Sequence, residues 1–157
     1  MRNDLVLQRL RTFLLLLAAG LSLGAIVELW AANHTEEPLQ WVPFVLCGLS
    51  LVAISAALLR PQRGVLLTLR GIMVVMVAGS LLGIYEHVEG NIAFAQEIHP
   101  NLDAGALLLE GLTGGNPLLA PGMLAVAALI ALAATYYHPA LAARYAPAPA
   151  VGVDNHA

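Results

Sequence analysis

The chain has 157 residues, of which 59% are apolar and only 11% are charged, with a formal net charge of −3. Soluble domains average roughly 45–50% apolar and about 25% charged residues, so the composition excludes an ordinary water-soluble domain and predicts a membrane protein. The seven basic residues are all arginines and make only a modestly basic side, which gives no support to nucleic-acid binding. The single cysteine, Cys47, excludes an intrachain disulfide.

The first predicted element is a transmembrane helix over residues 12–31. A hydrocarbon core of about 30 Å needs roughly 20 apolar residues as helix, and lipid offers no hydrogen-bond partners to irregular backbone. Arg11 precedes this span and Glu28 lies near its other end. Arginines followed by leucines are also typical of a secretory signal peptide. The candidate cleavage sites would need Leu29 or Trp30 where a small residue is required, so we expect the span to be retained.

Small residues mark one face of this first span. Gly20 and Gly24 have the GxxxG spacing, which allows two helices in lipid to approach closely. Two interpretations follow from this pair. Either the glycines contact another helix of the same bundle, or they contact another membrane subunit or a second copy of the chain.

The second and third spans are predicted over residues 41–59 and 65–85. The short connection between them predicts an antiparallel hairpin, and Cys47 is interpreted as a small buried hydrophobe. Arg70 lies inside the third span but near its start. Because long basic side chains can reach back to the interface, we expect its guanidinium to lie among the inner headgroups.

The segment over residues 86–116 is predicted to form an acidic, amphipathic cap outside the membrane. At about 100° per residue, a helix continuing from the third span to Pro100 would collect polar side chains on one face. That face consists of Glu86, Glu89, Ala93, Gln96 and Glu97. Asn101 or Asp103 is then expected to cap a short second helix that runs to Glu110.

This acidic segment also holds the candidate metal ligands. They are His87, His99, Glu86, Glu89 and Glu97, with His34, Glu36 and Glu37 on the first outer loop as further donors. Imidazole combined with carboxylate suits Zn, Cu, Fe or Ni. The spacing favours the alternative of a solvated acidic face with interfacial histidines, since His87 and His99 are roughly 120° out of phase on a helix. His34 with His87 is also a candidate pair of axial ligands for haem.

The fourth span is predicted over residues 117–137, and Pro139 ends it. Residues 140–157 are rich in alanine and proline and are predicted to form a disordered cytoplasmic tail. Aromatic residues are expected at both membrane interfaces. They are Trp30, Trp41 and Tyr85 on the outer side, and Tyr136 and Tyr137 on the inner side.

The arginines predict the orientation of the four spans. Arg2, Arg9, Arg11, Arg60, Arg63, Arg70 and Arg144 all fall on one predicted side. Because basic residues near membrane spans stay cytoplasmic, residues 1–139 are predicted to form an up-down-up-down bundle of four transmembrane helices with both termini in the cytoplasm. The absence of lysine with abundant Ala, Leu, Gly and Arg points to a GC-rich bacterial genome, and therefore to a multi-pass protein of the bacterial inner (plasma) membrane.

No enzyme motif of the GxSxG, HExxH, P-loop or GxGxxG type occurs in the chain. The second and fourth spans hold no charge, which argues against transport by one chain alone. We therefore expect a small non-enzymatic membrane protein without a cofactor, in contact with the lipid bilayer and acting as an accessory or assembly subunit. The alternatives are a metal-handling protein at the extracytoplasmic face, and an oligomeric small-solute transporter with Glu28 as its coupling carboxylate.

Overall fold

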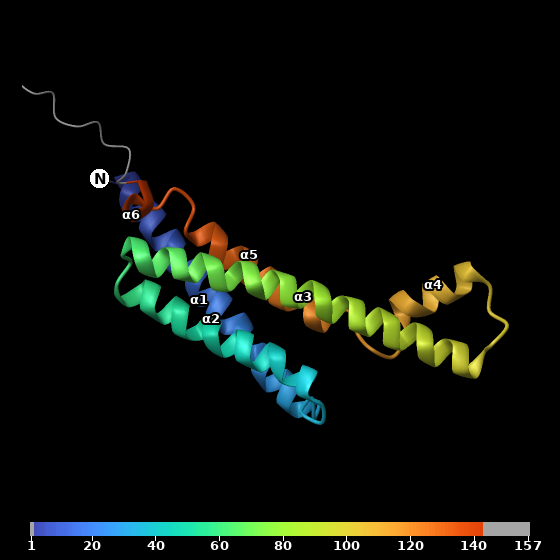
Figure 1. Cartoon of the computed structure of the whole chain (residues 1–157). Coiled ribbons are helices and arrows are strands. Elements are labelled where there is room, and N and C mark those ends of the chain that lie inside the picture. The colour runs from blue at the N-terminus through green and yellow to red at the C-terminus, as the bar shows by residue number, and fades with distance from the viewer. Residues whose placement is uncertain (1, 143–157) are drawn as a thin grey trace, which may run out of the picture.

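The computed structural model describes residues 2–142, and in this part of the chain every regular element is a helix. Figure 1 shows their arrangement. In chain order they are α1 (Arg2–Ala31), the 3-10 helix η1 (Pro38–Trp41), α2 (Val42–Leu59), α3 (Arg63–Ile98), α4 (Ala104–Thr113), α5 (Leu119–Ala134) and α6 (Pro139–Ala142). The predicted all-α class is confirmed.

Three of the helical stretches are long and apolar enough to cross a membrane. They cover Asn3–Ala31, Pro38–Leu59 and Arg63–Ile98. Only 17%, 33% and 28% of their most apolar windows is buried inside the protein, so most of their apolar side chains face outward. A water-soluble protein would hide such stripes in its core, whereas lipid solvates them directly.

Helices α1, α2, α3 and α5 share one core. Helix α5 packs against both α1 and α3, and α2 packs against the same two helices. The fully buried core side chains include Ala18, Ile54, Leu69, Met73, Met76, Ala128 and Ala131. Because α5 buries mainly alanines, its backbone comes close to its neighbours, as is typical of helices packed in lipid.

Two buried hydroxyls join helices across this core. Ser22 Oγ on α1 lies 3.1 Å from Ser50 Oγ on α2. Ser80 Oγ on α3 donates to the carbonyl oxygen of Pro121 on α5 at 2.6 Å. In apolar surroundings such bonds add to the close packing of small residues.

Helix α5 is shorter than the span predicted over residues 117–137. It begins at Leu119 and ends at Ala134, and its 16 residues measure about 24 Å at 1.5 Å per residue. Its end has a local cause, because Thr135 donates its hydroxyl to the Leu132 carbonyl at 2.8 Å. The chain then turns at Tyr137, whose φ of 48° is left-handed.

Arg70, predicted to reach towards the inner headgroups, bonds to the end of α5. Its Nε donates to Thr135 Oγ1 at 2.8 Å and its Nη2 to the Thr135 carbonyl at 3.0 Å. Arg11 on α1 donates to the Tyr137 carbonyl nearby at 3.0 Å. The last carbonyls of a helix lack intrahelical donors and carry partial negative charge, so the end of α5 attracts both guanidinium groups.

The acidic segment is a projecting helical hairpin. Helix α3 has 36 residues and is therefore about 54 Å long, and α4 packs back on its far part (Figure 1). The predicted polar face from Glu86 to Glu97 is fully exposed, which confirms the helical extension. Asp103 caps α4 as predicted, since its Oδ1 accepts from the backbone N–H groups of Gly105 and Ala106 at 2.8 and 2.9 Å.

Asn91, which the sequence does not single out, holds this hairpin together. Its side chain is only 3% exposed. Its Nδ2 donates to the carbonyls of Gly111 at 3.2 Å and Asn116 at 3.0 Å, and its Oδ1 accepts from the Asn116 N–H at 2.8 Å. Gly111 is required for the close approach, because a Cβ there would lie 2.8 Å from Cγ1 of Ile92.

The glycine pair on α1 does not contact the other helices. Gly20 and Gly24 are exposed, and a Cβ built on either would meet no atom within 4 Å. The interpretation that this pair packs inside the bundle is therefore wrong. Of the predicted tail, Pro139–Ala142 form the short helix α6, and residues 143–157 lie outside the described residues.

Candidate functional site

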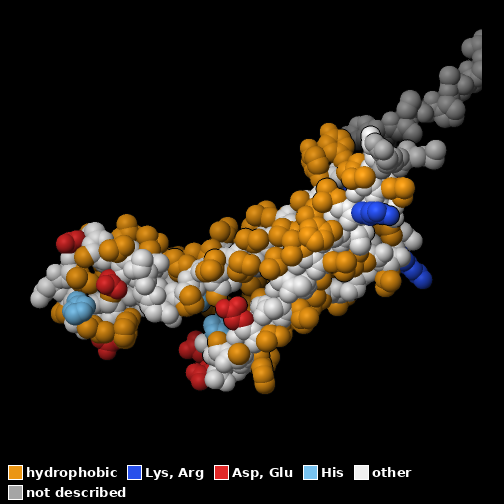
Figure 2. All heavy atoms as spheres, turned by 180° about the vertical axis from the view of Figure 1, so that it is seen from behind, with side chains coloured by type: hydrophobic (Ala, Val, Ile, Leu, Met, Phe, Trp, Pro, Cys, Tyr) orange, Lys and Arg blue, Asp and Glu red, His pale blue; other side chains and the backbone are white. Residues whose placement is uncertain are grey.

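Charged side chains gather at the two ends of the packed helices, with apolar surface between them (Figure 2). Arg11, Arg63 and Arg70 lie around the end of α5, which we call the arginine end. Residues 28–37 and 83–90 lie at the opposite end, which we call the acidic end. A cavity lies at each of these ends.

The cavity at the acidic end lies between α1, α2, α3 and α5 and has a volume of about 620 Å³. Ligand pockets typically measure about 300–1,000 Å³ and combine apolar walls with a few polar groups. The apolar walls include Leu29, Leu39, Leu46, Leu82 and Leu124. The ionisable groups that line the cavity are Glu28, His34, Glu37, Glu86 and His87.

His34 reaches the cavity because the chain reverses directly after α1. Asn33 takes a left-handed conformation with φ 51°, which asparagine tolerates better than most residues. The His34 N–H then donates to the Leu29 carbonyl at 3.0 Å, so the turn folds back over the end of α1. The ring is half-buried as a result.

His87 lies opposite on α3, and a backbone contact fixes the tautomer of its neutral ring. Its Nδ1 is 2.9 Å from the Pro117 carbonyl oxygen. Because a carbonyl can only accept, Nδ1 carries the proton, and Nε2 of the neutral ring is an acceptor. The His34 and His87 rings lie edge to face with centroids 6.5 Å apart. Burial, and secondly the charge of His87, lower the pKa of His34, so the neutral ring is favoured.

The three carboxylates give the cavity an anionic rim. Glu28, Glu37 and Glu86 come from α1, the first loop and α3, and all three are exposed. No arginine lines this cavity, and in the described part of the chain neither Glu28 nor Glu86 has a cationic partner. The site therefore combines negative charge, hydrogen-bond acceptors and an apolar interior.

The structure brings together only part of the predicted metal ligands. His87 and Glu86 line the cavity, and His34 and Glu37 of the wider donor pool join them. His99 caps the far end of α3, about 18 Å from His87 along the helix axis. Glu89 and Glu97 lie on the exposed face of α3 and do not line the cavity. Among residues 2–142, no group of three or more His, Cys, Asp or Glu side chains is arranged to hold one metal ion.

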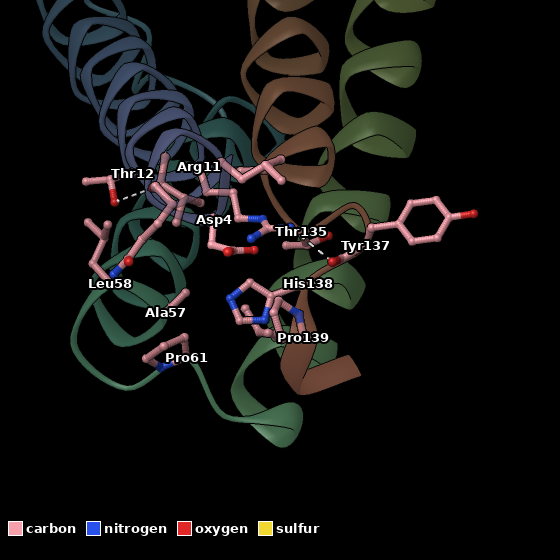
Figure 3. Close-up of a pocket in the computed structure, with 15 residues that line it drawn as sticks. Asp4, Arg11, Thr12, Ala57, Leu58, Pro61, Thr135, Tyr137, His138 and Pro139 are labelled. Carbon is pink, nitrogen blue, oxygen red and sulfur yellow. Dashed lines mark hydrogen bonds between the residues drawn. The ribbon is translucent and has the colours of Figure 1, made fainter. Parts of the chain in front are cut away.

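The second cavity, at the arginine end, measures about 470 Å³ (Figure 3). Its polar lining includes Asp4, Arg11, Thr135 and His138. His138 Nδ1 accepts from the Ala140 N–H at 3.2 Å. Burial, and secondly the charge of Arg11, lower the pKa of His138. This cavity is lined by groups that hold the end of α5, and it belongs to that end.

Comparison with protein-family models, curated proteins and solved structures found no match to this chain. The site is therefore interpreted from its own residues.

Proposed function

We propose that this chain is a small, non-enzymatic integral protein of the bacterial inner membrane that serves as an accessory or assembly subunit of a membrane complex. In this proposal α1, α2, α3 and α5 cross the bilayer in up-down-up-down order, and both termini are cytoplasmic. Three of these helices have the length and composition to span a membrane.

The position of α5 supports a fourth crossing despite its short length. Near its start, Pro121 accepts from Ser80 on α3, and at its end Thr135 accepts from Arg70 on the same helix. Helix α5 therefore runs beside the apolar middle of α3 over its whole length. The flanking residues 117–118 and 135–137 add the distance that a helix of about 24 Å lacks against a core of about 30 Å.

The distribution of charged and aromatic residues supports the orientation. Arg11, Arg63 and Arg70 bond to residues 135–141 at the arginine end, and the basic side chains seen in Figure 2 lie at this end too. Basic residues near spans favour the cytoplasm. Trp30 and Trp41 at the acidic end, and Tyr136 and Tyr137 at the arginine end, are all more than half exposed. Such aromatic side chains collect at the headgroup level of both membrane faces.

The outward face of Gly20 and Gly24 is the observation that carries the accessory role. Glycine inside a helix costs about 1 kcal/mol relative to alanine, and no contact within the described chain requires it at these two positions. In lipid, a GxxxG surface allows the backbone of a second helix to approach closely. A partner helix packed on this face would explain why both positions are glycine.

Blue-native electrophoresis and mass spectrometry after purification in mild detergent test this proposal. We expect the wild-type chain to run in a complex, and a Gly20→Leu/Gly24→Leu variant to lose its partner because two large side chains separate the helices. Gly71→Leu is the matched control, since Gly71 is also an exposed helical glycine whose Cβ would contact nothing. A wild-type chain that stays monomeric in several gentle detergents would contradict the proposal.

A further inference from the structure

We propose that the cavity at the acidic end binds an amphiphile with a primary ammonium group. The ammonium would lie among Glu28, Glu86 and His87, and the apolar part would lie against the leucines of the walls. This inference goes beyond the accessory role and does not depend on it, because the cavity is built from one chain alone.

The first support is the division of the cavity into an apolar interior and an anionic rim. Leu46 and Leu124 line the cavity and are themselves almost fully buried in the core, so its deep part is apolar. Glu28, Glu37 and Glu86 line it from three different elements. A small hydrophilic ion would leave the apolar part empty, whereas a molecule with a charged head and an apolar body fits both parts.

The sign of the charge excludes an anionic head. Among the described residues, three carboxylates and no arginine line the cavity, while Arg11, Arg63 and Arg70 lie at the other end of the bundle. An anion here would meet like charges with no donor of positive charge. A cation gives Glu28 and Glu86 the partner that the described chain does not supply.

The hydrogen-bonding groups favour a primary ammonium over a quaternary one. A carboxylate is an acceptor only. Because Nδ1 of His87 donates to the Pro117 carbonyl, Nε2 is the nitrogen that accepts when this ring is neutral. The favoured neutral form of His34 adds one more acceptor nitrogen. A primary ammonium has three N–H donors for these acceptors, whereas a trimethylated nitrogen has none.

Two sources provide this chemistry in a membrane. One is the ethanolamine headgroup of a phospholipid, whose amine would enter the cavity from the bilayer. The other is a free amine with an apolar chain, which would enter from water. Both present the same ammonium to Glu28 and Glu86, so the experiment has an arm for each.

The first arm measures binding of decylamine to the purified full chain in a neutral detergent by tryptophan fluorescence. The chain has two tryptophans, and Trp41 lies between the lining residues Gln40 and Val42. We expect a saturable change with decylamine and none with decanol or decanoate. A Glu28→Gln/Glu86→Gln variant should raise the Kd about tenfold, because it removes two exposed carboxylates that each pair with the ammonium. Glu97→Gln/Glu110→Gln is the matched control, with two carboxylates neutralised away from the cavity, and should bind as wild type.

The second arm distinguishes the sources by native mass spectrometry of the chain released from nanodiscs that contain phosphatidylethanolamine or phosphatidylglycerol. Retention of phosphatidylethanolamine that decylamine displaces identifies the lipid headgroup. Decylamine binding without lipid retention identifies a free amine. Ala120→Phe, which adds a ring to a lining residue at the start of α5, should abolish both signals.

Circular dichroism checks that each variant keeps its helical content, and Ala120→Phe keeps the test decisive if the double carboxylate variant fails to fold. Equal binding of decanol, or binding of decylamine that neither variant weakens, overturns the proposal. Binding of zinc through His34 and His87 with no response to decylamine also overturns it. A monomeric chain that binds decylamine would contradict only the accessory role, so the two proposals fail separately.

Discussion

Replacing Asn91 with alanine tests how the acidic hairpin is held. The change removes three hydrogen bonds and leaves the Gly111 carbonyl, the Asn116 carbonyl and the Asn116 N–H without their partner. A buried group left unsatisfied costs about 1–3 kcal/mol. Asn116 is exposed, so water can replace its two lost bonds, whereas Gly111 is buried. We therefore expect the free energy that holds the hairpin closed to fall by about 2 kcal/mol, which is the cost of one unsatisfied buried group and not of three.

Hydrogen exchange read by mass spectrometry locates this loss. Amides of residues 104–116 should exchange about 30-fold faster in Asn91→Ala, since each 1.4 kcal/mol corresponds to a factor of ten, while those of α2 keep their rates. Asn101→Ala is the control, because Asn101 is exposed in the turn before α4. Equal protection of residues 104–116 in wild type and Asn91→Ala would refute the role given to Asn91.

Three further substitutions test other contacts by thermal unfolding in detergent. Arg70→Met should lower the free energy of unfolding by about 1–2 kcal/mol, because losing the two bonds to Thr135 costs more than removing a charge from apolar surroundings gains. A variant more stable than wild type would contradict this. Ser22→Ala should cost about 0.6 kcal/mol, the average for polar contacts between membrane helices, and a loss above about 2 kcal/mol would contradict it. Burial and the charge of Arg11 lower the pKa of His138, so the unfolded chain binds more protons than the folded chain. The free energy of unfolding should therefore be highest above pH ~6.5 and should fall as the pH drops below it. His138→Gln should flatten this decline between pH 7 and 5, and an unchanged slope would argue against it.

The parts of the fold that follow from local pattern could be predicted from the sequence. Long apolar runs and short connections predict α1, α2 and α3 with their hairpin, because helix length and lipid burial depend on consecutive residues. The continuation of α3 and the capping of α4 by Asp103 follow from periodicity and from the preference of aspartate for helix starts. These features need no knowledge of distant residues.

Most contacts that build the candidate site could not be predicted in the same way, and the sequence pairs His34 with His87 only as candidate haem ligands. His87 is bonded to Pro117, and His34 meets His87 across the cavity, although each pair is far apart in the sequence. The sequence groups His87 with His99 as candidate ligands, although they are about 120° out of phase, and His99 lies at the far end of the same helix. Nothing local identifies Thr135 as the acceptor for Arg70.

The cavity at the acidic end follows from how closely α3 approaches its neighbours just before it. A Cβ at Gly79 would lie 2.6 Å from Cδ1 of Leu46 on α2, and one at Gly83 would lie 3.0 Å from Cβ of Pro121 on α5. These glycines let α3 contact both helices at the inner limit of the cavity. Beyond them α3 continues as an unbroken helix past His87, whereas α2 and α5 do not extend beyond their first residues in that direction. In the described chain no further helix therefore fills the space between α1 and α3. The glycines that tighten the core thus also leave a cavity at its acidic end, where the loop with His34 forms the remaining wall.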